Sequence, residues 1–278
     1  MFSIVILTYN EEQEVEACLK SVAWADDVLV FDSFSSDRTV ERALACGARV
    51  IQNRFENYAN QRQAALSQGD FKYPWVFMLD ADERFTSGLR AEIERELASA
   101  PADRAIYRLR RKDYFNGVWI RSSGGYPTWF GRLLRIGQVS ILRPINEQYE
   151  TSGSIGLLQE HIEHFPFNKG VERWIDRHND YSRREALALP RERLRPVPWR
   201  KLFSRDPAHR RAAMKSVYCR MPARPLMVFL YLYLWRRGFL EGRSGYHYAS
   251  LRMSYEIMID VKCWLAAQQP DADTLPPE

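Results

Sequence analysis

No glycine-rich phosphate-binding loop occurs in this chain of 278 residues. Both Gly-x-Gly-x-x-Gly and Gly-x4-Gly-Lys-Ser/Thr are absent, so neither a dinucleotide-binding fold nor a P-loop is predicted. Any phosphate group that binds this protein must therefore be neutralised by a metal ion and by basic side chains.

Cysteines are few, and long apolar runs are missing. The four cysteines are Cys18, Cys46, Cys219 and Cys263. They lie far apart and form no Cys-x-x-Cys pair, so we expect no disulfide framework, no zinc site and a reducing cytosol. The amino terminus has neither the basic start nor the cleavage site of a signal peptide. The longest apolar run, residues 225–235, is about half of the roughly 20 residues that span a bilayer, so no transmembrane helix is expected.

Short apolar runs alternate with helical patterns over the first hundred residues. Strands are predicted at residues 3–8, 27–32, 48–51 and 75–79, and helices between them and after the last. Asn10 is predicted to cap the first helix, with Gln13 as its capping-box partner. This alternation predicts an α/β fold, a Rossmann-like, mostly parallel sheet with helices on both faces. Such sheets bind ligands outside the carboxyl ends of their strands.

Carboxylates follow the fourth apolar run. Asp80 and Asp82 are two residues apart, and because side chains alternate along an extended chain, both are expected to point the same way. Two carboxylates leave open positions on Mg²⁺ or Mn²⁺ for phosphate oxygens. The alternative is an acidic turn after a strand. Because residues 8–11 and Asp32 also lie at the carboxyl ends of predicted strands, a nucleotide site at this edge of the sheet is favoured.

Four motifs occur in a recognisable order. They are IVILTYNEE at residues 4–12, VFDSFSSDRT at 30–39, QRQAAL at 61–66 and LDADER at 79–84. As a set they resemble the family 2 glycosyltransferases of the GT-A fold, and most closely the bacterial WaaE-type lipopolysaccharide-core and exopolysaccharide transferases. The resemblance implies a GT-A domain over residues 1–170, followed by a helical, basic extension over residues 171–278.

The resemblance also implies an activity. It is the transfer of a sugar, with inversion, from a nucleotide-diphosphate donor, expected to be a UDP-sugar, to a lipid-linked, lipopolysaccharide or exopolysaccharide glycan. Thr8, Tyr9 and Glu11 would line the base and ribose. Asp32 would hydrogen-bond the base, and Arg62 would approach the donor.

The remaining implied roles concern the metal and the proton. Asp80 and Asp82 would bind Mg²⁺ or Mn²⁺ and, through it, the donor diphosphate, with Asp80 also counted among the donor-binding residues. Glu147 would be the catalytic base, since the attacking hydroxyl must lose a proton. Asn146 departs from the family pattern, in which a histidine is common there, and a surface glutamate in a loop is the alternative for Glu147.

Further polar and aromatic side chains have two interpretations each. Arg132 and Arg135 are candidates to hold the diphosphate or an anionic acceptor, or they are solvated strand ends. His161 and His164 either reach the metal or the leaving group, or are structural. Trp119, Tyr126 and Trp129 either stack on a sugar or belong to the core.

The last third of the chain is basic and has a clustered apolar stretch. Residues 191–224 contain eleven Lys and Arg against Glu192 and Asp206, and an apolar stretch flanked by arginines follows. This pattern suits a helix at a membrane interface, which predicts a cytoplasmic enzyme peripheral on the inner face of the membrane. The alternative is a core helix with a basic face.

Two other functions remain open at this stage. One is a nucleotidyltransferase on a similar sheet, and the other is a non-catalytic protein that binds membrane or nucleic acid through the basic segment. The acidic residues at the predicted sheet edge argue against nucleic acid as a partner there.

Overall fold

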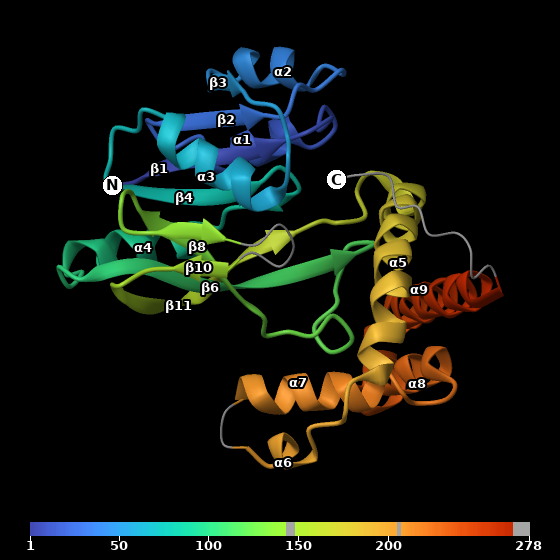
Figure 1. Ribbon diagram of the computed structural model, residues 1–278. Coiled ribbons are helices and arrows are strands. Elements are labelled where there is room, and N and C mark those ends of the chain that lie inside the picture. Colours follow the sequence, from blue (N-terminus) through green and yellow to red (C-terminus); the bar gives the residue numbers. More distant parts are fainter. Residues whose placement is uncertain (143–147, 205–206, 269–278) are drawn as a thin grey trace. The chain divides into compact units, whose positions relative to one another are not determined.

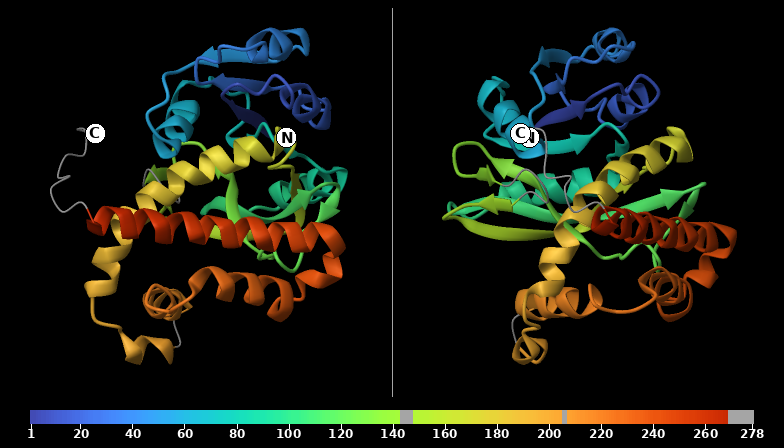
Figure 2. Two further views of the ribbon diagram at one scale, coloured as in Figure 1. Left: turned by 90° about the vertical axis from the view of Figure 1, so that its right-hand side faces the viewer. Right: turned by 45° about the vertical axis from the view of Figure 1, so that its right-hand side comes forward.

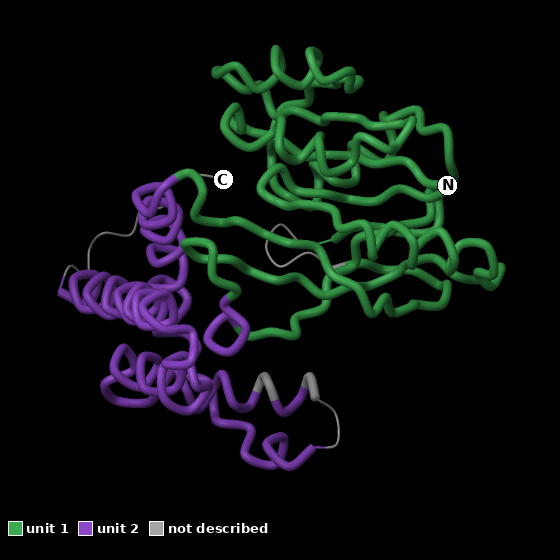
Figure 3. The backbone as a smooth tube through the Cα atoms, turned by 180° about the vertical axis from the view of Figure 1, so that it is seen from behind, with its two compact units in different colours: residues 1–119, 125–169 green, residues 120–124, 170–278 purple. Residues whose placement is uncertain are grey.

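The computed structural model describes residues 1–142, 148–204 and 207–268. The chain forms two compact units (Figure 3). The first contains residues 1–119 and 125–169, and the second contains residues 120–124 and 170–278. Each unit is described below by itself.

The first unit begins with alternating strands and helices. In chain order these are β1 (Ser3–Thr8), α1 (Val15–Ser21), β2 (Val28–Asp32), α2 (Thr39–Ala45), β3 (Arg49–Gln52), α3 (Tyr58–Gln68), β4 (Trp75–Asp80), β5 (Glu83–Arg84) and α4 (Ser87–Ala98). Strands dominate the remainder, which comprises β6 (Arg104–Phe115), β7 (Val118–Trp119), β8 (Trp129–Arg135), β9 (Ser140–Leu142), β10 (Gln148–Glu150) and β11 (Ser154–His164).

One sheet organises this unit. Its strand order is β3-β2-β1-β4-β8-β6-β11-β5, with β7 paired to β6, and β9 and β10 form a separate pair. The four strands β3, β2, β1 and β4 are parallel and lie side by side in Figure 1. Beyond β4 the sheet is mixed, because β8 runs antiparallel to both β4 and β6. The expected α/β fold is confirmed.

Both faces of the sheet are covered, as predicted. Ile4 and Ile6 of β1 pack in a core that includes residues of α1, α2 and α4. Val5, between them, packs on the opposite face with residues of α3. A strand buried on both faces reads as a continuous apolar run, which is why β1 was visible in the sequence.

The second unit is helical, which confirms the expected carboxyl-terminal extension. It contains α5 (Gly170–Leu194), α6 (Trp199–Leu202), α7 (Pro207–Tyr218), α8 (Arg224–Leu230), the π-helix η1 (Tyr231–Trp235), the 3-10 helix η2 (Gly238–Glu241) and α9 (Gly242–Gln268). The long helix α9 packs against α5 and α8 (Figure 2). The segment 120–124 joins this unit because Glu241 accepts hydrogen bonds from Ser122 and Ser123.

Two expectations about local chemistry have clear outcomes. All four cysteines are described and none forms a disulfide, as expected. Asn10 does not cap the first helix, since α1 begins only at Val15. Instead Asn10 has a positive φ of 53°, and its Oδ1 accepts a hydrogen bond of 2.8 Å from the backbone N–H of Ser36. The Asn10 side chain therefore bonds to Ser36, 26 residues away in the sequence, and not to the start of the helix that follows it.

No helix in the described ranges is both long and apolar enough to cross a bilayer.

Candidate active site

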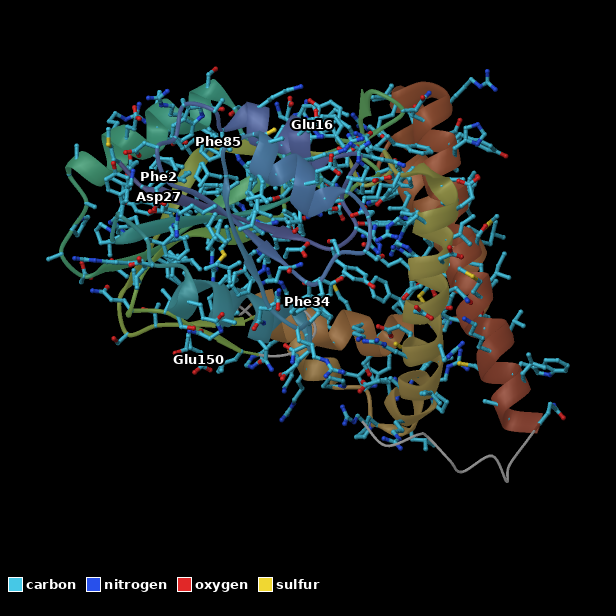
Figure 4. The ribbon with its side chains drawn as sticks, turned by 90° about the horizontal axis from the view of Figure 1, so that it is seen from above. Phe2, Glu16, Asp27, Phe34, Phe85 and Glu150 are labelled. Atoms are coloured by element: carbon cyan, nitrogen blue, oxygen red, sulfur yellow. The ribbon has the colours of Figure 1, made fainter. Side chains whose placement is uncertain are left out.

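The carboxyl ends of the parallel strands meet at one edge of the sheet. Thr8 is in register with Asp32, and Leu7 is in register with Asp80. Figure 4 shows Phe34, in the loop after β2, at the opposite end of the strand from Asp27. The predicted donor-binding residues of β1, β2 and β4 are therefore brought to the same edge.

Asp32 is fully buried and holds the loop that follows β2. Its carboxylate accepts hydrogen bonds from Thr8 Oγ1 at 2.8 Å, from the Ser35 N–H at 2.8 Å and from Gln52 Nε2 at 3.0 Å. The Ser35 hydroxyl also donates to it. With these donors in place, Asp32 shapes the loop, and its bond to a nucleotide base stays a prediction.

The loop after β1 has one exposed aromatic ring and one paired carboxylate. Tyr9 is 55% exposed at the edge of the sheet. Glu11 is paired with Lys169, which also donates to the backbone carbonyl of Asn10 at 2.9 Å. Lys169 had no signal in the sequence, because 158 residues separate it from Glu11 and only the fold brings them together.

Asp80 is held between two arginines. Arg62 Nη2 donates to its Oδ1 at 2.7 Å, and Arg132 Nη2 donates to its Oδ2 at 2.8 Å. Arg132 also donates to Glu83 Oε1 at 2.6 Å and is only 3% exposed, so it is neither a solvated strand end nor a free cation. Burial alone would raise the pKa of Asp80, but Arg132 and Arg62 hold it well below its usual range.

Glu83 braces the turn that carries Asp80 and Asp82. Its Oε2 accepts a hydrogen bond of 2.9 Å from the Asp80 backbone N–H. Burial raises its pKa to about 7, although Arg132 opposes the shift. Glu83, directly after Asp82 in the sequence, therefore supports the site through the backbone of the turn.

A histidine links Asp82 to β6. His164 Nε2 lies 3.3 Å from Asp82 Oδ2, and His164 Nδ1 lies 2.7 Å from Asp113 Oδ1. Arg111 Nε contacts the same Asp113 oxygen at 2.9 Å. Burial would lower the pKa of His164, but Asp82 and Asp113 raise it to about 9. This geometry brings His164 to the edge that carries Asp82, and its contact with a metal ion or leaving group stays a prediction.

Asp113 and Arg111 were missed in the sequence. The available signal was weak, since Asp113 is the single acidic residue of a strand rich in arginine and lysine. Its importance depends on the pairing of β6 with β11, in which Asp113 is in register with His164.

Asp82 and Asp80 differ in how well their oxygens fit a divalent ion. Asp82 and His164 form a carboxylate–imidazole pair whose imidazole has a second carboxylate behind it, an arrangement common around metal ligands. Each carboxylate oxygen of Asp80 already contacts an arginine, so a metal ion would have to share these oxygens with Arg62 and Arg132. Within the described ranges, no three His, Cys, Asp or Glu side chains are grouped for a metal ion.

Of the remaining predicted site residues, Arg62 is described by the structure and Glu147 is not. Arg62 is 5% exposed and donates to Asp80, and its predicted approach to the donor stays a prediction. Glu147, the predicted catalytic base, lies outside the described residues.

Comparison with known proteins identifies relatives of this chain. The family model described as Glycosyl transferase family 2 matches residues 3–165. The chain is 28% identical over 265 residues to the lipopolysaccharide core biosynthesis glycosyltransferase LpsC of Rhizobium meliloti (strain 1021), covering 90% of this chain and 89% of LpsC. It is 29% identical over 206 residues to the uncharacterized glycosyltransferase RC0292 of Rickettsia conorii, covering 68% of this chain and 71% of that protein.

A solved structure is also similar. It is the glucosyl-3-phosphoglycerate synthase of Mycobacterium tuberculosis in complex with Mn²⁺, UDP-glucose and phosphoglyceric acid. The identity is 20% and the TM-score is 0.35, over 40% of this chain and 44% of that one.

Proposed function

The chain belongs to glycosyltransferase family 2, and on that premise we propose that it transfers a sugar with inversion from a UDP-sugar to a glycan hydroxyl. Family membership favours this activity over a nucleotidyltransferase, because the match extends across residues 3–165. The observation that carries the proposal is the convergence of Asp80, Asp82 and His164 at the carboxyl edge of a parallel sheet.

Two chemical demands define the reaction. The diphosphate leaves with its negative charge, and the attacking hydroxyl loses a proton. A divalent ion, Mg²⁺ or Mn²⁺, would supply Lewis-acid stabilisation of that diphosphate. Asp82 would hold the ion, His164 would join it on releasing its Nε2 proton, and Asp80 stays a predicted ligand.

The protein's own side chains prepare this edge. Asp113 receives the Nδ1 proton of His164 in a hydrogen bond and so directs Nε2 toward Asp82. Arg62 and Arg132 keep Asp80 ionised. Thr8, Tyr9, Glu11 and Asp32 remain the proposed contacts of the nucleotide, and Glu147 remains the proposed general base.

The proposed acceptor is a lipid-linked or lipopolysaccharide glycan. LpsC, which matches 90% of this chain, is named for lipopolysaccharide core biosynthesis. Such acceptors are presented at a membrane, so we place the protein at the inner face of the cytoplasmic membrane.

Exposed apolar side chains in the second unit support this location. Between residues 226 and 240 the exposed large ones are Leu226, Met227, Leu230, Tyr231, Leu234, Trp235, Phe239 and Leu240. Trp235 is 80% exposed and precedes Arg236 and Arg237, so this stretch combines apolar and cationic groups, as an interfacial segment requires. Its exposure favours this interpretation over an ordinary core helix.

The transferase proposal is tested by thermal shift with a set of nucleotide sugars, with and without Mn²⁺. We expect one UDP-sugar to raise Tm only with the metal. Asp82→Asn should abolish that shift, whereas Asp103→Asn, a change of an exposed carboxylate at the amino end of β6, should retain it. No metal-dependent shift with any nucleotide sugar would contradict the proposal.

Membrane docking is tested by flotation with phosphatidylglycerol liposomes at low salt. The wild type should float, and Trp235→Glu should remain in the dense fraction. Leu44→Glu changes an equally apolar residue, 56% exposed on α2, and should float like the wild type. If all three proteins stay dense, the peripheral location is wrong.

A further inference from the structure

A cluster of cations and aromatic rings lies on β6, β7 and the start of β8. The Arg110 guanidinium carbon lies 5.8 Å from the Tyr126 ring centroid and 5.4 Å from that of Trp129. Lys112 Nζ lies 4.5 Å from the Trp119 ring centroid, and Trp119 meets Tyr126 edge to face at 5.1 Å. We call these five residues the cation–aromatic cluster.

The cluster lies close to the site but on the other face of β6. Side chains alternate along a strand, so Arg110 and Lys112 point away from the face that carries Arg111 and Asp113. The contacts agree, since Arg111 and Asp113 reach Glu83 and His164 instead. Because β6 runs in the same direction as β4, its carboxyl-terminal half extends toward the edge that carries Asp80.

The two cations of the cluster have no acidic partner in the part of the chain that the structure describes. Neither Arg110 nor Lys112 forms an ion pair there, and Arg110 Nε is buried without a hydrogen-bond acceptor. The register neighbour of Lys112 on β11 is Glu163, whose Oε1 accepts a hydrogen bond from Tyr114 Oη at 3.2 Å. By contrast, Arg111 and Arg132 on the other face are paired with carboxylates.

The neighbouring histidine, His161, responds to the positive charge of Lys112. Burial and then Lys112 lower the pKa of His161, so its ring is neutral at neutral pH and adds no charge of its own. Trp119, Tyr126 and Trp129, which carry the aromatic rings of the cluster, are each half-buried.

From this arrangement we infer that the cation–aromatic cluster binds the acceptor, and that the acceptor is a saccharide carrying a carboxylate or phosphate group. Aromatic rings stack on sugar faces, and guanidinium and ammonium groups bind such anions through charge-assisted hydrogen bonds. This inference rests on the proposed transferase function and narrows its acceptor to anionic glycans. Under this inference, Arg110 and Lys112 bind the anionic group of the acceptor. Arg132 and Arg135, which were candidates for that role, do not.

Arg135 provides a matched control. It lies 5.9 Å from the Trp75 ring centroid, so it is also a cation over an indole, but at the other end of β8. It donates to the carbonyl of Ala102 at 2.6 Å, which gives it a structural role there.

The test follows the indole N–H resonances of Trp119 and Trp129 in the full-length protein. Four ligands are titrated. Glucose 6-phosphate and glucuronate are sugars with a phosphate and a carboxylate group, respectively. Glucose is the sugar without a charge, and inorganic phosphate is the anion without a sugar. We expect both indoles to shift with at least one anionic sugar, and more weakly with glucose or phosphate alone. Lys112→Met and Arg110→Met should each weaken that binding roughly tenfold, whereas Lys112→Arg and Arg135→Met should not.

The outcomes separate this inference from the proposed function. If UDP binds with Mn²⁺ but no anionic sugar shifts the indoles, the inference fails and the transferase stands. Equal binding of glucose and its anionic relatives would also overturn it. If UDP itself shifts both indole resonances and displaces the anionic sugar, Arg110 and Lys112 bind the donor nucleotide, and the inference is wrong. Lys112→Met keeps the test valid if Arg110→Met fails to fold, because Lys112 lies nearer the carboxyl end of β6 and is only partly buried.

Discussion

Two buried histidines, one in each unit, have opposite surroundings. His164 and His178 are both only 9% exposed. His164 lies between the carboxylates of Asp82 and Asp113, which raise its pKa to about 9 against the effect of burial. His178 stacks on Trp174 with ring centroids 3.5 Å apart, and burial lowers its pKa to about 4.

The difference shows that burial does not identify a functional histidine. His178 Nδ1–H donates a hydrogen bond of 2.8 Å to the Trp174 carbonyl, and the ring also contacts aromatic rings of α5 and α9. It behaves as a core residue that remains neutral. His164 has a carboxylate at each ring nitrogen and lies next to an Asp-x-Asp motif. Its partners, and not its exposure, assign it to the site.

Of the substitutions around the two histidines, His164→Phe is expected to have the largest effect on stability and on ligand binding. Removing the imidazole leaves the partly buried Asp82, whose side chain is 26% exposed, without this partner, which should cost about 3 kcal/mol of unfolding free energy. The change should also abolish the metal-dependent thermal shift with a UDP-sugar. Urea unfolding at pH 7.5 measures the first effect.

His178→Phe is the matched control at the same pH. Phenylalanine keeps the stacking on Trp174, and the histidine that it replaces is neutral, so the loss should be about 1 kcal/mol or less. Equal losses for the two variants would mean that the carboxylates around His164 contribute no more than aromatic packing does around His178.

A smaller effect is predicted for Asp113→Asn. The amide keeps the shape of the side chain but removes the charge that orients His164, so Mn²⁺ affinity should fall about 10- to 100-fold. Isothermal titration with Mn²⁺ and UDP measures the change. Asp103→Asn, in the turn just before the same strand, should leave the affinity unaltered, and an unaltered affinity in Asp113→Asn would remove Asp113 from the site.

The smallest effect is a pH dependence that originates at His178. Its pKa in the folded protein lies below the ordinary value of 6.5, so the unfolded chain binds a proton that the folded chain takes up only near pH 4. The stabilisation is therefore present above pH 6.5 and is lost as the pH falls toward 4.

Between pH 7.5 and pH 5 this contribution amounts to about 1–2 kcal/mol. Urea unfolding followed by the Trp174 indole resonance should show the loss in the wild type and a smaller loss in His178→Phe. An identical pH dependence in both proteins would assign the effect to other groups.

The sheet and its functional edge were accessible to prediction from the sequence. The strands at β1, β2 and β4 are continuous apolar runs buried on both faces, and the alternation with helices predicts that their carboxyl ends meet. Thr8, Asp32 and Asp80 were found in this way. The part after residue 100 was harder, because its strands are charged and pair with strands far away in the chain.

The sequence by itself determined the α/β class, the position of the Asp-x-Asp turn and the apolar stretch after residue 225. These depend on local periodicity, which any short window reveals. Only the tertiary structure decided that Asp80 is held by two arginines, that Asp113 supports His164 and that Arg110 and Lys112 have no acidic partner among the described residues. The partner of a charge depends on strand register, and a shift of one residue moves each side chain to the opposite face.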